Sequence, residues 1–102
     1  MENRRIHPRV SVEAEVWLGE DGVFTHGRER ITNLSVGGAF IEAKTGYALG
    51  SVVSIRFLLG SHYITSTTVV RNAVPGGWIE VDFIDVSREN EERLAAFIAN
   101  LE

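Results

Sequence analysis

The chain has 102 residues, no cysteine and a formal net charge of −4. This length supports one hydrophobic core without a metal or disulfide, and the lack of thiols excludes cysteine chemistry. The acidic balance argues against a general nucleic-acid binder, which needs a broad basic surface. Charged first residues and the lack of an apolar run of roughly 18 residues predict neither a signal peptide nor a membrane span. We therefore expect a cytoplasmic protein without membrane contact.

Arg4, Arg5 and Arg9 lie at the start of the chain, ahead of the first strand pattern. Arginine presents a planar fork of donors that fits phosphate oxygens and the guanine acceptors O6 and N7. Residues 1–9 therefore predict a flexible arm that binds a compact anion. For the arm taken alone, a solvated tail that only improves solubility is the alternative.

Short segments rich in Val, Ile, Thr and aromatic residues, separated by turns, cover most of the chain. In the first segment Val16 and Leu18 alternate with Glu15 and Trp17, which is the period of a half-buried strand. The segments with strand patterning are residues 10–18, 23–34, 39–43, 53–59, 63–72 and 78–84. Short connections and the need to avoid exposed edges favour an all-β fold, a six-stranded antiparallel barrel over residues 10–85.

The second of these segments is more polar than the first. Gly27 within it predicts a bulge or irregularity. We expect the neighbouring Arg28, Glu29 and Arg30 to form its solvent-exposed face.

After Asp85 the apolar period changes from that of a strand to that of a helix. Ser87 is a suitable N-cap, and acidic residues follow it in the first turn. The apolar residues at helical spacing are Leu94, Phe97, Ile98 and Leu101. An amphipathic helix over residues 87–101 is therefore predicted to pack against the barrel.

Asn33, Ser35, Gly37 and Gly38 form a polar, glycine-containing link between two strand segments. Asn and Ser offer short polar groups, and glycines permit positive φ and close approach of a ligand to the backbone. By itself this pattern is also typical of an ordinary turn.

Arg5-x-x-x-Arg9 followed one hairpin later by Asn33-x-Ser35-x-x-Gly38 resembles the two-part motif of the PilZ domain family, whose members are receptors for the bacterial second messenger cyclic di-GMP. The resemblance covers nearly the whole chain and implies a PilZ-like barrel closed by a helix. It assigns phosphate and guanine contacts to Arg5 and Arg9, and guanine contacts to Asn33 and Ser35. It implies that Gly38 keeps the strand surface open to the ligand.

Two further positions affect what the resemblance implies. An arginine at the place of Arg4 is associated in this family with two intercalated cyclic di-GMP molecules, so we expect two ligands per chain. Family members often have glycine where this chain has Glu80. If Glu80 faces the ligand its charge weakens binding, and if it faces solvent it has no effect. Arg71, at the end of a strand, is a secondary ligand candidate.

We therefore predict a cyclic di-GMP receptor or adaptor whose N-terminal arm changes conformation on binding and which signals to a protein effector. We expect no enzymatic activity and no metal, because the sequence contains no nucleophile–base pair or metal-ligand spacing. We also expect no cofactor, and a monomer or weak dimer. The first alternative is a PilZ-like adaptor that does not bind the nucleotide, as Glu80 suggests. The second is a small barrel that binds single-stranded RNA through the arm and Trp17 or Trp78, although the acidic charge argues against it.

Overall fold

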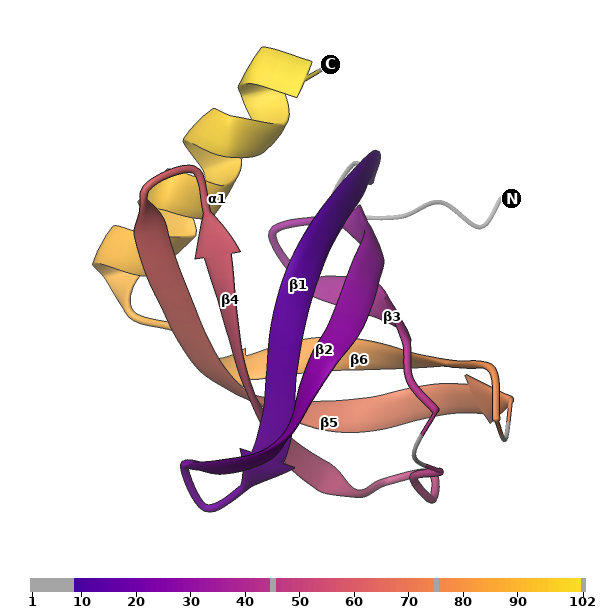
Figure 1. The fold of residues 1–102 in the computed structure, drawn as a ribbon. Helices are drawn as coiled ribbons and strands as arrows, with labels where there is room; N and C mark the ends of the chain where they lie inside the picture. Colours follow the sequence, from indigo (N-terminus) through magenta and orange to yellow (C-terminus); the bar gives the residue numbers. More distant parts are fainter. Residues whose placement is uncertain (1–8, 45, 75, 102) are drawn as a thin grey trace, which may run out of the picture.

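Antiparallel strands close into a barrel, and one helix follows them in the chain (Figure 1). The computed structural model describes residues 9–44, 46–74 and 76–101, and for residues 26–28 the backbone alone. Its elements are β1 (Val10–Glu20), β2 (Val23–Leu34), β3 (Gly38–Glu42), β4 (Val52–Leu59), β5 (His62–Val74), β6 (Trp78–Asp85) and α1 (Arg88–Leu101).

The first hairpin follows from the local sequence. Along β1 the side chains of Val16 and Leu18 are fully buried, while those of Glu13 and Glu15 on the opposite face are exposed. Asp21 and Gly22 then form a two-residue turn with φ of 54° and 78°. Positive φ at both central residues matches the twist of the strands on either side, so this turn returns the chain directly into β2.

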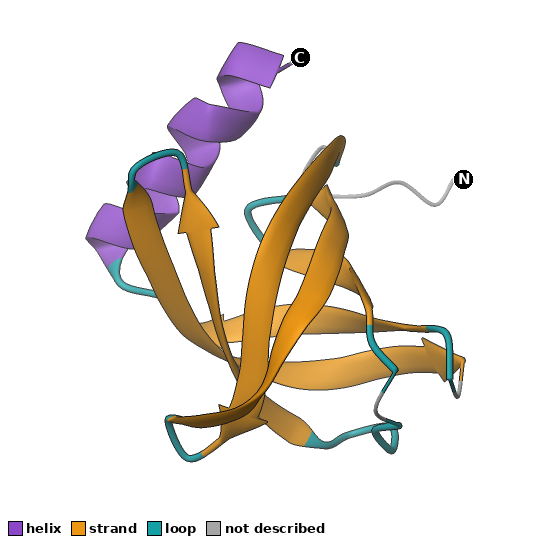
Figure 2. Cartoon of the chain, in the orientation of Figure 1, coloured by secondary structure: helices purple, strands orange, loops and turns teal. Residues whose placement is uncertain are grey.

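The strand order around the barrel is β1-β2-β3-β6-β5-β4, and every neighbouring pair is antiparallel. Contacts between β3 and β6, and between β1 and β4, join segments far apart in sequence (Figure 2). The barrel interior holds one apolar cluster that includes Phe57, Ile55 and Val81. The prediction of a six-stranded antiparallel barrel with a C-terminal helix is confirmed.

The C-terminal helix begins as its sequence predicts. The backbone N–H of Asn90 donates to Oγ of Ser87 at 3.1 Å, which makes Ser87 the N-cap. Leu94 and Ile98 are buried in the same apolar cluster as the barrel interior. Leu101 is 49% exposed, so the apolar face is shorter than predicted. Within the described part of the chain, no helix is long and apolar enough to span a membrane.

Strand β2 departs from the prediction at one side chain. Its pairing with β1 shifts register across the segment that contains Gly27, where an irregularity was predicted. Glu29 was predicted to be exposed but is buried, because it lies two residues from Ile31 and so on the inward-facing side. Its carboxylate accepts the backbone N–H of Lys44 at 3.2 and 3.3 Å, which compensates for part of the burial.

Candidate ligand-binding site

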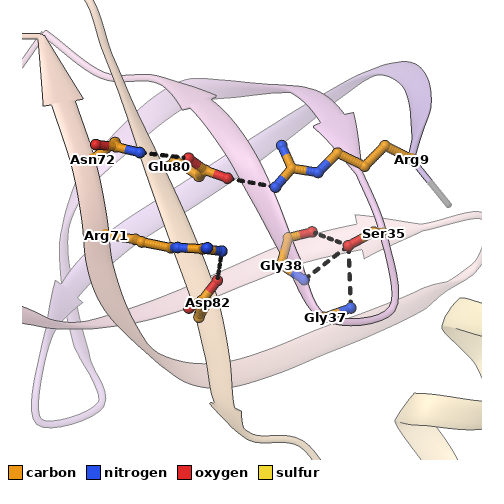
Figure 3. Close-up of polar contacts among 8 residues, drawn as sticks. All are labelled: Arg9, Ser35, Gly37, Gly38, Arg71, Asn72, Glu80 and Asp82. Carbon is orange, nitrogen blue, oxygen red and sulfur yellow. Dashed lines mark hydrogen bonds and ion pairs between the residues drawn. The ribbon is translucent and has the colours of Figure 1, made fainter. Parts of the chain in front are cut away.

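Arg9 lies immediately before β1, on the outer face of the barrel. Because Val10 pairs with Leu34, Arg9 lies beside the end of β2 and the link to β3. Its guanidinium carbon lies 4.7 Å from the centroid of the Phe40 ring, and its NH2 group donates to Oε2 of Glu80 (Figure 3). The side chains of Arg9 and Glu80 are only 14% and 9% exposed. An aromatic ring and a carboxylate therefore hold the guanidinium at the surface of the barrel.

Phe40 connects this arginine to β6. Along β3 the neighbours Ala39 and Ile41 are buried in the barrel core, so Phe40 points outward. Its ring stacks on that of Trp78, with centroids 5.1 Å apart and an interplanar angle of 20°. Arg9, Phe40 and Trp78 thus cover the outer surface of the β3–β6 pair.

Asn33 lies on β2, between β1 and Phe40 of β3. It pairs in register with Ser11 of β1 and with Phe40 of β3. Its side-chain oxygen Oδ1 is buried and has no hydrogen-bond partner among the described residues. A buried acceptor without a donor is unfavourable, typically by about 1–3 kcal/mol, so a donor that reached this oxygen would gain binding energy.

Ser35 organises the link between β2 and β3 (Figure 3). Its hydroxyl oxygen accepts the backbone N–H groups of Gly37 and Gly38, each at 3.1 Å, and the hydroxyl donates to the carbonyl oxygen of Gly38 at 3.3 Å. The backbone N–H of Ser35 also donates to that carbonyl, at 2.9 Å. Because the hydroxyl is buried and occupied within the turn, it shapes the turn in this structure.

The two glycines of the link both contact β6, and Gly38 is needed for close packing against that strand. Gly37 accepts the backbone N–H of Phe83 at 2.9 Å, and Gly38 pairs with Asp82. A Cβ placed on Gly38 would overlap the carbonyl oxygen of Val81. Gly38 is not among the glycines with positive φ in the described chain, so its requirement here comes from the neighbouring strand.

Glu80 is held from two sides. It pairs in register with Phe40 on one side and with Asn72 on the other, and Asn72 Nδ2 donates to its Oε1 at 3.0 Å. Burial favours the neutral acid, but the hydrogen bonds from Asn72 and Arg9 and the charges of Arg9 and Arg71 outweigh it and lower the pKa of Glu80 below 4.5. Glu80 is therefore a buried carboxylate that is charged at neutral pH.

A second, more exposed ion pair lies beside the first. Arg71 NH1 donates to Oδ1 of Asp82 at 3.3 Å, and these side chains are 57% and 41% exposed. Asp82 is the register partner of Gly38, which places Arg71 next to the link between β2 and β3. A single exposed pair of this kind contributes little to stability and is easily exchanged for another anion.

The structure therefore brings Arg9, Asn33, Ser35, Gly37 and Gly38 to one place on the barrel. Arg4 and Arg5 lie outside the described residues, and their roles stay predictions.

Sequence reasoning missed the contributions of Phe40 and Asn72. Phe40 could have been noticed, because alternation with Ala39 and Ile41 directs a large aromatic side chain outward. Asn72 gave no such signal, since its partner Glu80 lies on another strand.

Solved structures with this fold include two informative neighbours. The structure of Bacillus subtilis inhibitor of motility (MotI/DgrA) has a TM-score of 0.81 and 15% identity, covering 97% of this chain and 52% of that one. This chain thus spans about half of that protein's length. The crystal structure of the PilZ domain of CeSA from a cellulose-synthesizing bacterium has a TM-score of 0.67 and 21% identity, covering 92% and 97% of the two chains.

Sequence comparison gives the family. No curated protein sequence matches this chain significantly. The sequence profile of the PilZ domain, however, matches residues 3–100, nearly the whole length. Both halves of the motif lie within that match, and the barrel agrees with the fold of the two neighbours. The chain therefore belongs to the PilZ domain family.

Proposed function

We propose that this PilZ domain is a receptor for cyclic di-GMP, which it binds on the outer face formed by β2, β3 and β6. One observation carries the proposal. Arg9 of the first motif and residues 33–38 of the second lie side by side, although they are separated by the whole β1–β2 hairpin. A ligand with two phosphates and two guanines needs cationic forks and polar groups gathered in this way.

Arg9 is the best-supported contact. Its guanidinium is pre-positioned over Phe40, so little side-chain entropy remains to be lost when it meets a phosphate or the guanine O6 and N7 acceptors. Asn33 supplies a complementary group, because its unpartnered Oδ1 can accept a guanine N–H. An amide has one acceptor oxygen where aspartate has two, which limits this contact.

Ser35, Gly37 and Gly38 serve the site indirectly in this proposal. The hydroxyl of Ser35 holds the turn, and Gly38 lets β3 approach Val81 closely. Together they set the position of Asn33 relative to Arg9. Loss of Ser35 would therefore weaken ligand binding by displacing Asn33.

The output of the switch is proposed to be a changed protein surface. Arg4 and Arg5 would bind the ligand together with Arg9, so the arm, residues 1–9, would change conformation and alter what a protein effector meets. The neighbour named inhibitor of motility gives an example of this fold in a regulatory protein. We propose a binding role without catalysis, in the cytoplasm where an intracellular messenger is available.

Calorimetric titration with cyclic di-GMP tests the proposal. We expect wild type to bind, and Arg9→Ala to bind about 100-fold more weakly through the loss of two charge-assisted hydrogen bonds. Arg56→Ala is the matched control, because Arg56 also lies over an aromatic ring, Tyr63, but on β4. Folded wild type that gives no heat of binding would favour the adaptor without nucleotide. Equal binding by wild type and Arg9→Ala would place the ligand elsewhere.

Arg4 determines the stoichiometry in this proposal. A third guanidinium can reach a second, stacked ligand molecule by charge and cation–π contact. We expect a molar ratio of two ligands per wild-type chain and of one for Arg4→Ala. A ratio of one for wild type would contradict the assignment to Arg4 and leave the receptor role intact.

A further inference from the structure

Arg9 already has an anionic partner in this structure. Its NH2 group is bonded to Oε2 of Glu80, and the contact is nearly closed to solvent. Phosphate oxygens and the guanine Hoogsteen edge need the same donors of the guanidinium fork that a carboxylate uses. A bound ligand and Glu80 would therefore compete for the guanidinium of Arg9.

The contacts around Glu80 hold its carboxylate beside Arg9. Its other oxygen, Oε1, accepts from Asn72 at 3.0 Å, and Phe40 lies beside it on β3. The nearby charge of Arg71 further favours the ionised form, as the lowered pKa of Glu80 indicates. Because Asn72 and Arg71 remain when Arg9 is withdrawn, the carboxylate is not left isolated, and the exchange is feasible.

We infer that Glu80 is a built-in competing anion: cyclic di-GMP binds by replacing the Glu80 carboxylate on Arg9, so Glu80 raises the ligand concentration at which the switch responds. The inference rests on the proposed function and adds its regulation. It also differs from both roles considered from the sequence, because Glu80 faces neither open solvent nor an empty ligand surface. It is covered by the arginine that the ligand requires.

The test compares cyclic di-GMP affinity, measured calorimetrically, among wild type, Glu80→Gln and Glu42→Gln. Glutamine keeps the size of Glu80 and an acceptor oxygen but removes the charge that holds Arg9. Glu42 is the matched control: it lies two residues from Phe40 on the same outer face, is exposed, and is 3.8 Å from Arg30. Its substitution removes the same charge without touching Arg9.

We expect Glu80→Gln to bind about tenfold more tightly than wild type and Glu42→Gln to bind within about twofold of wild type. Binding by Glu80→Gln at ligand concentrations too low for wild type to bind would support the inference most strongly. Equal or weaker binding by folded Glu80→Gln, with wild type binding, would overturn the inference and leave the receptor function standing. Equal gains in both variants would also overturn it, because they would reflect general charge. If neither wild type nor Glu80→Gln gives a heat of binding, the receptor function itself is overturned, and the inference with it.

Discussion

Two arginines of this barrel lie against aromatic rings on opposite sides of the molecule. The Arg9 cluster consists of Arg9, Phe40, Trp78 and Glu80 on the β3–β6 pair. The Arg56 cluster consists of Arg56, Tyr63 and Trp17, beside the β1–β4 pair, which the strand order places across the barrel from β3–β6. The guanidinium carbons lie 4.7 and 4.3 Å from the ring centroids, so the cation–π geometry is nearly the same.

Burial and counter-charge distinguish the clusters. Arg9 is almost covered and paired with a buried carboxylate. Arg56 and Tyr63 are exposed, and among the described side chains no carboxylate lies within ion-pair distance of Arg56. Charges interact more strongly where water is excluded, so an arginine–aromatic contact has a larger effect on the β3–β6 side. The environment of an arginine, rather than its aromatic partner, therefore determines how much the contact contributes to stability.

The largest expected effect concerns Gly38, which holds β3 against β6 beneath the Arg9 cluster. Gly38→Ala should lower the free energy of unfolding by about 3 kcal/mol, because its Cβ would overlap the Val81 carbonyl oxygen. Chemical denaturation measures this change. Gly46→Ala is the control, since a Cβ there meets no atom within 4 Å. Equal effects at both positions would show that the β3–β6 contact is looser than described.

The next largest effect is the difference in stability lost when each of the two arginines is replaced. Arg9→Ala should lower the free energy of unfolding by about 2 kcal/mol, because it leaves Glu80 buried without its guanidinium. Arg56→Ala should lower it by less than about 1 kcal/mol, as expected for an exposed cation–π contact. Denaturation of both variants at neutral pH and without ligand measures the difference. Equal losses would remove the distinction between the clusters.

The pH dependence of stability tests whether the charge of Glu80 stabilises the Arg9 cluster. The folded pKa of Glu80 lies below its ordinary value of 4.5, so its stabilising contribution is complete above that value. As pH falls below 4.5 and through the folded pKa, the carboxylate is protonated and the contribution is lost. The stability difference between wild type and Glu80→Gln should therefore shrink between neutral pH and acid, as measured by denaturation. A constant difference would mean that the Glu80 charge does not stabilise the fold.

The smallest expected effect lies in the Arg56 cluster. A double-mutant cycle of Arg56→Ala and Tyr63→Ala should give a coupling energy of about 0.5 kcal/mol in unfolding free energy, because water screens this exposed contact. A coupling above about 2 kcal/mol, the range of desolvated pairs, would show that exposure does not separate the two clusters.

Much of the local structure was predictable from the sequence. Alternation at Val16 and Leu18 predicted the first strand, and Ser87 predicted the start of the helix. Strand boundaries differed slightly: the fifth segment was predicted to begin at residue 63, and β5 begins one residue earlier, at His62. These features depend on residues a few positions apart, whose spacing alone determines which face is buried and where a turn is favoured.

The site was predictable only in part. The motif residues Arg9, Asn33, Ser35, Gly37 and Gly38 come together as a family resemblance implies. The position of the Ser35 hydroxyl within its own turn did not follow from the motif, because a hydroxyl can face either a ligand or the backbone. The burial of Glu29, by contrast, could have been predicted from its alternation with Ile31 along β2.

Sequence alone is enough to locate the strand segments, the capped helix and the two halves of the PilZ motif, because each depends on residues close together in the chain. The position of β6 between β3 and β5 follows only from the closed barrel. That arrangement puts Phe40 and Asn72 on either side of Glu80 and brings Arg9 over it. A side chain's charge can be read from the sequence, but its partners come from strands that only the closed barrel brings together.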